Sequence, residues 1–233
     1  IKQYCNTIKS QPVTLVIGVS GGVDSAVTST LSAKTGLKTI AVSMPIKQNP
    51  KQHDLSIKHL EWLKSNFENV ITKEISLDSI FSSFEETMYD FKNNLAFANS
   101  RSRLRMITLY QIAQSNNGLV VGTGNKVEDF GVGFYTKYGD GGVDISPIAD
   151  CTKTQVWEIA SKMFIIPDII EAQPTDGLWD DSRNDERQLG LTYKQIEEAM
   201  DNKDSKYYEK YMQIRKPNLH KMKPIPICLF EDD

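Results

Sequence analysis

The sequence contains few cysteines, no long apolar run and no excess of positive charge. Only Cys5, Cys151 and Cys228 occur in 233 residues, far apart and without a Cys-x-x-Cys pair. We therefore expect free thiols in a reducing compartment and no structural metal site. No apolar run has the length of a membrane span and no basic-then-apolar leader is visible, so we expect a cytoplasmic protein without a membrane partner. A formal net charge of −3 argues against a nucleic-acid partner.

The remaining composition is that of an ordinary globular protein. Charged residues make up 24% of the chain and hydrophobic residues 39%, which excludes a disordered or fibrous protein. The length suits one domain that can bury a sizeable core. Because no internal repeat and no interdomain linker are visible, we predict a single domain over residues 1–233.

The most informative stretch is Ser20-Gly21-Gly22-Val23-Asp24-Ser25. It follows the apolar run 13–19 and leads into a helix-compatible segment, which predicts a buried strand, a tight loop and a helix N-terminus. Glycines allow the backbone to approach a ligand closely, and the first N–H groups of the helix can bind phosphate. The stretch therefore predicts a nucleotide phosphate site, and the alternative is an ordinary Gly-Gly turn.

This loop lacks the lysine of a Walker A motif, because Val23-Asp24-Ser25 stands in its place. The negative charge of a phosphate must then be neutralised by a metal or by a distant side chain. The hydroxyls of Ser20 and Ser25 can donate hydrogen bonds, and Asp24 can hold a divalent cation. We therefore predict a metal-assisted phosphate site.

Strand-like and helix-like segments alternate along the first half of the chain. Strands are expected at 13–19, 37–44, 69–75 and 119–122, with a last apolar stretch at 145–148, and helices at 24–35, 54–67, 77–91 and 98–114. Further helices are expected at 152–164, 192–201 and 204–215. The alternation predicts an α/β fold, with an open parallel sheet of about five strands, helices on both faces and additional C-terminal helices.

Ligands of such a sheet bind beyond the C-terminal ends of its strands. The loops at 20–25, 44–48 and 122–125 should therefore converge. Met44, at the end of the second strand, is placed either beside a nucleotide base or in the core. Two segments have the composition of mobile loops: residues 122–142 contain seven of the fourteen glycines, and residues 173–190 are polar and interrupted by proline and glycine. For the second segment a plain surface loop is the alternative.

Two isolated features add candidates. Asn99 and Arg103 lie four residues apart on one helix face and could grip one polar ligand together, although Arg101, Arg103 and Arg105 could equally form a solvated charged face. Lys153 stands in the first turn of a predicted helix, where a positive charge opposes the helix dipole unless an anion is near. That position predicts a phosphate contact.

The stretch SGGVDS resembles the loop of the ATP pyrophosphatase superfamily, a Rossmann-like fold of the adenine nucleotide alpha hydrolase type, which cleaves ATP between its α and β phosphates. Further patches are similar to one branch, the ammonia-dependent NAD synthetases: GT at 122–123 with Glu128, TKYGDGGVD at 136–144, TK at 152–153, PTDGLW at 174–179, DERQLG at 185–190 and HK at 220–221. These patches cover nearly the whole chain, and TKYGDGG is the most specific of them.

The resemblance implies an ATP-dependent ligase that adenylylates the nicotinic acid carboxylate of deamido-NAD and amidates it with ammonia, giving NAD, AMP and pyrophosphate. It also implies Mg²⁺ as cofactor and a homodimer with the dinucleotide at the interface. The implied ATP-binding residues are Gly18, Val19, Ser20, Gly21, Gly22, Val23, Asp24, Ser25, Met44, Thr123, Lys153 and Thr175. The implied deamido-NAD-binding residues are Asn99, Arg103, Lys137, Asp144, His220 and Lys221. Asp24 and Glu128 are implied as metal ligands, and Asp140 and Asp185 as catalytic residues.

Two departures from the family pattern stand out. The usual His-Lys-Arg is here His220-Lys221-Met222, and the loop between Glu128 and the following aromatic residues is one residue longer than in some members. The rival hypotheses are another adenylating ligase, such as a GMP synthetase core or a tRNA thiolase, and a nucleotide-binding regulatory module without catalysis. The tRNA branch would favour a basic surface and paired cysteines, and a regulatory module would leave Asp24, Glu128 and Lys153 without a task.

Overall fold

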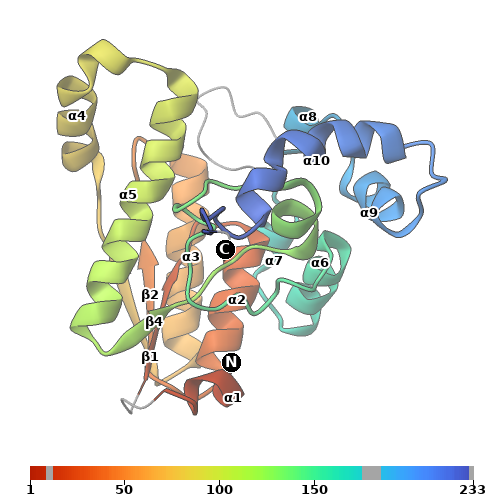
Figure 1. The fold of residues 1–233 in the computed structure, drawn as a ribbon. Coiled ribbons are helices and arrows are strands. Elements are labelled where there is room, and N and C mark those ends of the chain that lie inside the picture. Colours follow the sequence, from red (N-terminus) through yellow and green to blue (C-terminus); the bar gives the residue numbers. More distant parts are fainter. Residues whose placement is uncertain (9–12, 175–184, 231–233) are drawn as a thin grey trace.

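A parallel β-sheet with helices on both faces forms the centre of the protein in a computed structural model (Figure 1). The structure describes residues 1–8, 13–174 and 185–230. The strands in this part of the chain are β1 (Thr14–Gly18), β2 (Thr39–Ser43), β3 (Val70–Glu74) and β4 (Gly118–Val120). The helices are α1 (Lys2–Cys5), α2 (Val23–Ala33), α3 (Pro50–Asn66), α4 (Asp78–Thr87), α5 (Asn94–Ser115), α6 (Lys153–Lys162), α7 (Pro167–Ile170), α8 (Asp185–Leu189), α9 (Tyr193–Asp201) and α10 (Tyr208–Met222), with a 3₁₀ turn η1 (Tyr89–Phe91) and a π-helix η2 (Lys126–Val132).

The strand order is β3-β2-β1-β4, and every neighbouring pair is parallel. This confirms the predicted α/β fold, with four strands in the described residues instead of about five. The expected fifth segment makes only an isolated parallel bridge between Val121 and Ile145. Pro147, two residues further on, has no N–H to donate to a strand ladder, which limits the pairing there.

Alternate residues of β1 pack into two separate cores. Leu15 and Ile17 belong to a cluster with Leu60 and Leu63 of α3, whereas Val16 belongs to a cluster with Met106 and Leu109 of α5. Successive side chains of a strand point to opposite faces, so both faces of the sheet are covered and the strand is apolar throughout. The C-terminal ends of the strands are the place where a ligand of such a sheet binds.

The C-terminal part of the chain builds two further clusters beside the sheet. Val156 and Ala160 of α6 pack against Val23 and Val27 of α2. The helices α9 and α10 pack around the π-helix η2, at the upper right of Figure 1. The C-terminal helices thus attach the glycine-rich segment 122–142 to the rest of the protein.

Several helix bounds differ from the expectation for identifiable reasons. Helix α3 begins at Pro50, earlier than residue 54, because Asn49 caps it and proline suits the first helical position. Helix α10 continues to Met222, past the expected end at 215 and through Pro217. Asn218, the next residue, donates to the Val132 carbonyl at 3.0 Å, so contacts with the π-helix support this part of α10.

The π-helix η2 lies inside the segment that the sequence predicts as a long glycine-rich loop. A π-helix accommodates one residue more than an α-helical turn does. Such an element can take up one extra residue, but the extra residue between Glu128 and the aromatic residues stays a prediction from the sequence. Both Glu128 and its neighbour Asp129 face the main cavity.

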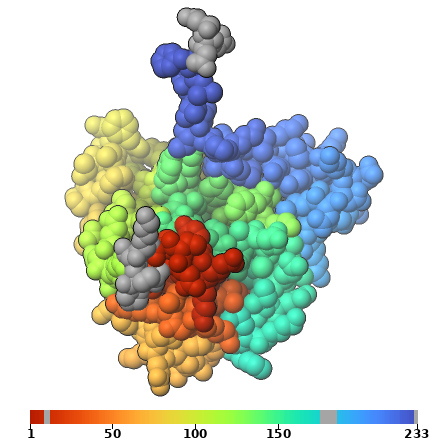
Figure 2. All heavy atoms as spheres, turned by 60° about the horizontal axis from the view of Figure 1, so that its bottom comes forward, coloured from red at the N-terminus to blue at the C-terminus, as the bar shows by residue number. Residues whose placement is uncertain are grey.

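The chain after α10 runs away from the body of the molecule, where it exposes Ile225, Ile227, Leu229 and Phe230 (Figure 2). No helix in the part of the chain that the structure describes is long and apolar enough to cross a bilayer.

Candidate functional site

A cavity of about 850 Å³ opens at the C-terminal ends of the strands. Its walls include the whole stretch Gly18–Ser25, Ser43 to Gln48 in part, and residues 121–124. The three loops that the sequence expects to converge thus meet at one cavity. Its size suits a nucleotide together with a second substrate.

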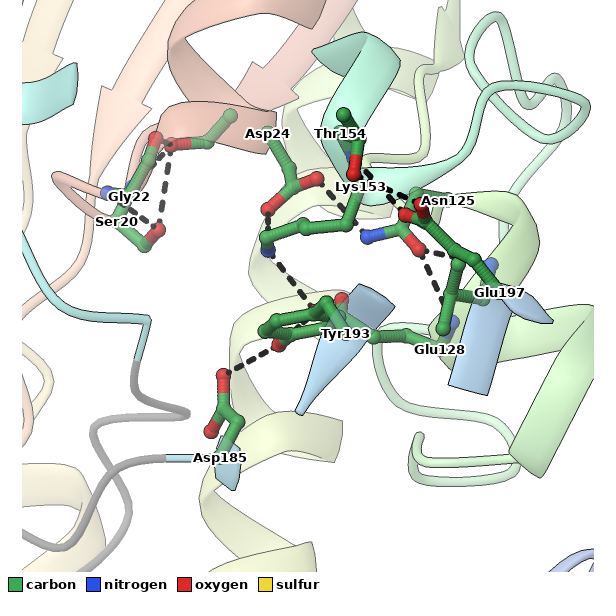
Figure 3. A network of polar contacts seen from close by, with 12 residues as sticks. Ser20, Gly22, Asp24, Asn125, Glu128, Lys153, Thr154, Asp185, Tyr193 and Glu197 are labelled. Atoms are coloured by element: carbon green, nitrogen blue, oxygen red, sulfur yellow. Dashed lines mark hydrogen bonds and ion pairs between the residues drawn. The ribbon is translucent and has the colours of Figure 1, made fainter. Parts of the chain in front are cut away.

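The glycine loop, residues 20–25, is held in shape by its own hydroxyl groups (Figure 3). The Ser25 hydroxyl donates to the Gly22 carbonyl at 2.9 Å and accepts from the Ser20 N–H at 3.2 Å. Gly21 has φ +89°, and a Cβ there would lie 2.6 Å from the Gln52 carbonyl oxygen. Glycine is therefore required at this position both by backbone conformation and by the close approach of α3.

A buried lysine lies between the two carboxylates that the resemblance implies as metal ligands. Lys153 Nζ is 2.6 Å from Asp24 Oδ2 and 2.9 Å from Glu128 Oε1 (Figure 3). The lysine is only 2% exposed, and its ammonium also lies 5.0 Å from the centre of the Tyr193 ring. Burial alone would lower the pKa of Lys153, but the two carboxylates outweigh it and the pKa is raised. The ammonium is therefore charged at neutral pH.

The charge of Lys153 at the start of α6 thus has a different partner from the one expected. Thr152 and Gln155 form a capping box that satisfies the helix N-terminus without an external ligand. The two carboxylates compensate the lysine, so no phosphate is needed to explain its position. A phosphate contact by Lys153 remains a prediction.

Asn125 organises the same cluster from the glycine-rich segment, and sequence reasoning missed it. Its amide nitrogen donates to Asp24 Oδ1 at 3.0 Å, and its amide oxygen accepts from the N–H groups of Val127 and Glu128. The side chain is fully buried. An asparagine three residues before an acidic residue is a recognisable cap signal, which could have pointed to this element.

Tyr193, the first residue of α9, was also missed. Its hydroxyl lies 2.5 Å from Glu128 Oε1 and 3.2 Å from Asp185 Oδ2, and the residue is 1% exposed. Burial and the neighbouring carboxylates of Glu128 and Asp185 raise the pKa of the phenol, which therefore keeps its proton. No local motif marks this tyrosine, because its partners lie 65 and 8 residues away. We call Asp24, Asn125, Glu128, Lys153 and Tyr193 the Lys153 cluster.

Asp140 also lines the cavity, and a side chain of α5 that lies 38 residues away in the sequence holds it. Asp140 Oδ1 accepts from the Ser102 hydroxyl at 2.6 Å and from the Thr136 N–H at 3.0 Å. Asp140 is an exposed residue, but the protein groups around its carboxylate exclude enough water to raise its pKa, although these hydrogen bonds act in the opposite direction. Asp140 also faces a smaller adjoining cavity of about 100 Å³ that Lys221 and Asp129 line. The pKa of Asp129 is raised as well, by burial and by the charge of Asp140.

The wall near β2 holds Met44 and a buried arginine. Met44 is 6% exposed and belongs both to the core and to the cavity lining. Arg105 Nε donates to the Met44 carbonyl at 2.9 Å, and its guanidinium donates to Gln48 Oε1 at 3.2 Å. Burial lowers the pKa of Arg105 to about 10, so it stays charged. Arg105, which sequence reasoning left unassigned, thus fixes the loop 44–48.

The remaining implied ligands divide into two groups. Asn99, Thr123 and Lys221 line the main cavity, whereas the lining does not include Arg103, Lys137, Asp144 or His220. Asp144 instead accepts from the Val120 N–H at 2.7 Å and from the Tyr110 hydroxyl at 3.1 Å. Thr175 and most of the expected mobile segment 173–190 lie outside the described residues, so their roles stay predictions.

The donor set fits a hard divalent cation in one respect. Asp24 and Glu128 bring two carboxylates to one point, and such oxygens are the ligands that Mg²⁺ prefers. Within residues 1–8, 13–174 and 185–230 no group of three or more His, Cys, Asp or Glu side chains could hold a metal. Asp24 and Glu128 are thus the pair of carboxylates that the described residues offer to such a cation, and Lys153 Nζ lies between them.

Comparison with known proteins agrees with this geometry. Residues 1–224 match the NAD synthase family. The NH(3)-dependent NAD(+) synthetase of Carboxydothermus hydrogenoformans is 38% identical over 192 residues, which are 78% of this chain and 74% of the relative. A solved NMN synthetase from Francisella tularensis has a TM-score of 0.85 and 33% identity, with 93% of this chain and 89% of that chain covered. The fold is also that of the NH3-dependent NAD synthetase from Campylobacter jejuni, with a TM-score of 0.77, 24% identity, and 98% and 94% of the two chains covered.

Proposed function

The chain belongs to the NAD synthase family, and from that premise we propose that its cavity converts deamido-NAD, ATP and ammonia to NAD, AMP and pyrophosphate. As a member of this family it is an ATP-dependent ligase that forms a C–N bond. The observation that carries the proposal is the meeting of the glycine loop and the Lys153 cluster at one cavity.

The triphosphate would lie against the glycine loop, where backbone N–H groups at the start of α2 point to the cavity. Asp24 and Glu128 would hold Mg²⁺, which would supply positive charge against the phosphates. Lys153 keeps a positive charge in the same place, and it would support the departing pyrophosphate. Met44 and the loop that Arg105 fixes would bound the adenine, with Thr123 and Thr175 near the phosphates or ribose.

The amidation step would take place between Asp140 and Asp185. Ammonia attacks the carbonyl carbon of the adenylylated nicotinic acid, the C–N bond forms, and AMP leaves with the electrons of the broken C–O bond. The extra proton on nitrogen must pass to a base, and a carboxylate within reach can accept it. The raised pKa of Asp140 suits that task, because a carboxylate with a higher pKa binds the released proton more strongly.

We further propose a homodimer whose interface completes the deamido-NAD site. Arg103 is exposed on α5, on one face with Leu95 and Ile107, which are 59% and 66% exposed. Phe84, Tyr89 and Phe91 add exposed aromatic area beside them. An apolar face of this kind is typical of a protein interface. Arg103, Lys137, Asp144 and His220, which do not line the cavity of one protomer, would then meet the dinucleotide together with Asn99 and Lys221 at the interface.

A cytoplasmic location is part of the proposal. Its support is the presence of free cysteines at 5, 151 and 228, which suits a reducing compartment.

A second substrate can be tested directly. The Francisella tularensis relative is an NMN synthetase, so amidation of nicotinic acid mononucleotide is the alternative reaction on the same fold. Both substrates carry the same reacting carboxylate and differ in the adenylate half.

The test is product analysis with ATP, Mg²⁺, ammonia and either deamido-NAD or nicotinic acid mononucleotide. We expect NAD, AMP and pyrophosphate from the dinucleotide, with a higher kcat/KM than for the mononucleotide. A preference for the mononucleotide would replace the substrate but keep the chemistry. Release of ADP and phosphate would contradict adenylyl transfer itself.

A further inference from the structure

Tyr193 contacts both an implied metal ligand and an implied catalytic residue through one atom. Its hydroxyl lies 2.5 Å from Glu128 Oε1 and 3.2 Å from Asp185 Oδ2. Figure 3 shows Asp24, Lys153, Tyr193 and Asp185 in one continuous row. The Tyr193 hydroxyl therefore connects the proposed metal site to the proposed site of amidation.

Neighbouring side chains and backbone contacts hold the ring of Tyr193 in one orientation. The ring packs edge-on against Trp157 with centroids 5.8 Å apart, and Lys153 Nζ lies 5.0 Å from its centre. The backbone N–H of Tyr193 donates to Glu186 Oε1 at 3.0 Å, and the Thr192 capping box fixes the start of α9. A hydroxyl held this firmly orients the groups that it touches.

The contacts of Glu128 explain why such an orientation is needed. Its carboxylate receives Lys153 and Tyr193 on the same oxygen, Oε1, and the residue belongs to a π-helix. A glutamate side chain has three rotatable bonds, so without these donors the carboxylate would sample several positions. Hydrogen bonds from outer residues fix the direction of metal-binding carboxylates in proteins.

Asp185 is tied to the same atom from the other side. It begins α8, directly after the residues outside the described part, and its N–H donates to the Pro174 carbonyl at 3.0 Å. A phenol has a single proton, which Glu128 and Asp185 must share. The shorter distance assigns most of that proton to Glu128.

We propose that Tyr193 is a positioning residue that orients Glu128 for cation binding and couples it to Asp185. The inference rests on the proposed function, because Glu128 and Asp185 take their roles from it. Tyr193 itself touches no substrate in this scheme, and it acts through the two carboxylates.

The test measures the binding of Mn²⁺ together with a non-hydrolysable ATP analogue, α,β-methylene ATP, to the full chain without the acceptor substrate. Tyr193→Phe removes one oxygen and keeps the ring, and we expect a loss of affinity of about 10- to 100-fold, as for other outer residues of metal sites. The matched control is Tyr211→Phe, since Tyr211 is also buried and its hydroxyl donates to the Gly131 carbonyl at 3.2 Å. We expect the control to bind as the wild type does, within about twofold.

A second variant tests the coupling of Glu128 to Asp185 through Tyr193. Asp185→Asn replaces a charged competitor for the phenol proton by a weaker, neutral acceptor, so the analogue should bind at least as tightly as to the wild type. In the Tyr193→Phe background the Asp185→Asn change should have no effect on binding. An equal loss of affinity on Asp185→Asn in both backgrounds would overturn the coupling, because the two residues would then act independently.

Thermal unfolding checks that each variant is folded. If Tyr193→Phe is too unstable to assay, Glu128→Asp takes its place, since it keeps the charge and withdraws the carboxylate from the hydroxyl. Wild-type affinity in the folded Tyr193→Phe variant, or in Glu128→Asp, would refute the proposal while the wild-type reaction stands. A wild-type chain that binds no Mn²⁺ and nucleotide would instead refute the proposed function and the inference together.

Discussion

The glycine loop and the Lys153 cluster face the same cavity, but they are built by opposite means. The loop consists of six consecutive residues that are shaped by backbone conformation and by two serine hydroxyls. The Lys153 cluster gathers charged and polar side chains from positions 24 to 193. The shape of the loop thus depends on glycine and on close contacts between uncharged groups. The cluster depends on the balance between its positive and negative charges. Only Asp24 belongs to both.

The largest effect on stability should come from removing the central charge of the cluster. Lys153→Met leaves two partly buried carboxylates, with side chains 16% and 15% exposed, without the charge between them, and we expect the free energy of unfolding to fall by about 3 kcal/mol. Urea denaturation measures this loss. The control is Lys58→Met, which breaks an ion pair with Asp168 that is half-exposed on both sides, and we expect a much smaller loss because solvent screens exposed ion pairs. Equal effects in the two variants would contradict the charge-balance account.

The next effect concerns the residue that both regions share. Asp24→Asn keeps the shape of the side chain but leaves Lys153 with Glu128 as its only carboxylate partner among those described. We expect turnover to fall by a factor on the order of 10³, which corresponds to about 4 kcal/mol of activation free energy. Pyrophosphate release measures turnover, and circular dichroism checks the fold. Wild-type turnover in this variant would remove Asp24 from the metal site.

The next prediction concerns a buried histidine that stays neutral in the folded protein, which should make the free energy of unfolding depend on pH. His59 is fully buried, bonded to the Ser29 hydroxyl at 2.9 Å and stacked on Trp62. Burial lowers its pKa to about 4, so the folded protein stays neutral there while the unfolded chain binds a proton below about pH 6.5. The stability from this group is therefore complete above pH 6.5 and is lost as the pH falls towards 4, by about 3 kcal/mol in total.

The measurement is the pH dependence of the free energy of unfolding for wild type and His59→Gln. Glutamine retains a polar group opposite Ser29 but does not titrate. We expect the difference between the two profiles to shrink steadily from pH 6.5 to pH 4, because only the wild type loses this contribution. Parallel profiles would show that His59 titrates alike in the folded and unfolded chains.

The smallest effect distinguishes two reasons why a position requires glycine, which are a positive φ and close contact with a neighbouring atom. Gly21→Ala meets both a positive φ and the Gln52 carbonyl, whereas Gly36 has φ +78° and no atom within 4 Å of the place that a methyl group would take. We expect Gly36→Ala to lower the free energy of unfolding by about 1 kcal/mol and Gly21→Ala by about 2–3 kcal/mol. ATP affinity should fall only for Gly21→Ala. Similar losses in both variants would mean that contact with α3 does not shape the loop.

The same contrast explains what could be predicted from the sequence. The strand, glycine loop and helix at 13–33 follow from apolar runs and from residues with local conformational preferences. Asp24, Glu128 and Lys153 could be named together only through the family resemblance, and their mutual contact could not be derived from spacing. Tyr193 and Arg105 carry no local signal, because a buried hydroxyl or guanidinium is recognised by its partners alone. The fifth strand was expected from an apolar run whose proline prevents extended pairing.

The π-helix at 126–132 has a consequence for how this protein tolerates change in length. One residue added within an α-helix turns everything after it by about 100° around the axis. A π-helical turn is wider and can take up one added residue, so the aromatic residues and Asp140 that follow would keep their direction. A change of one residue in the length of this part of the cavity wall would therefore leave the segment downstream in place.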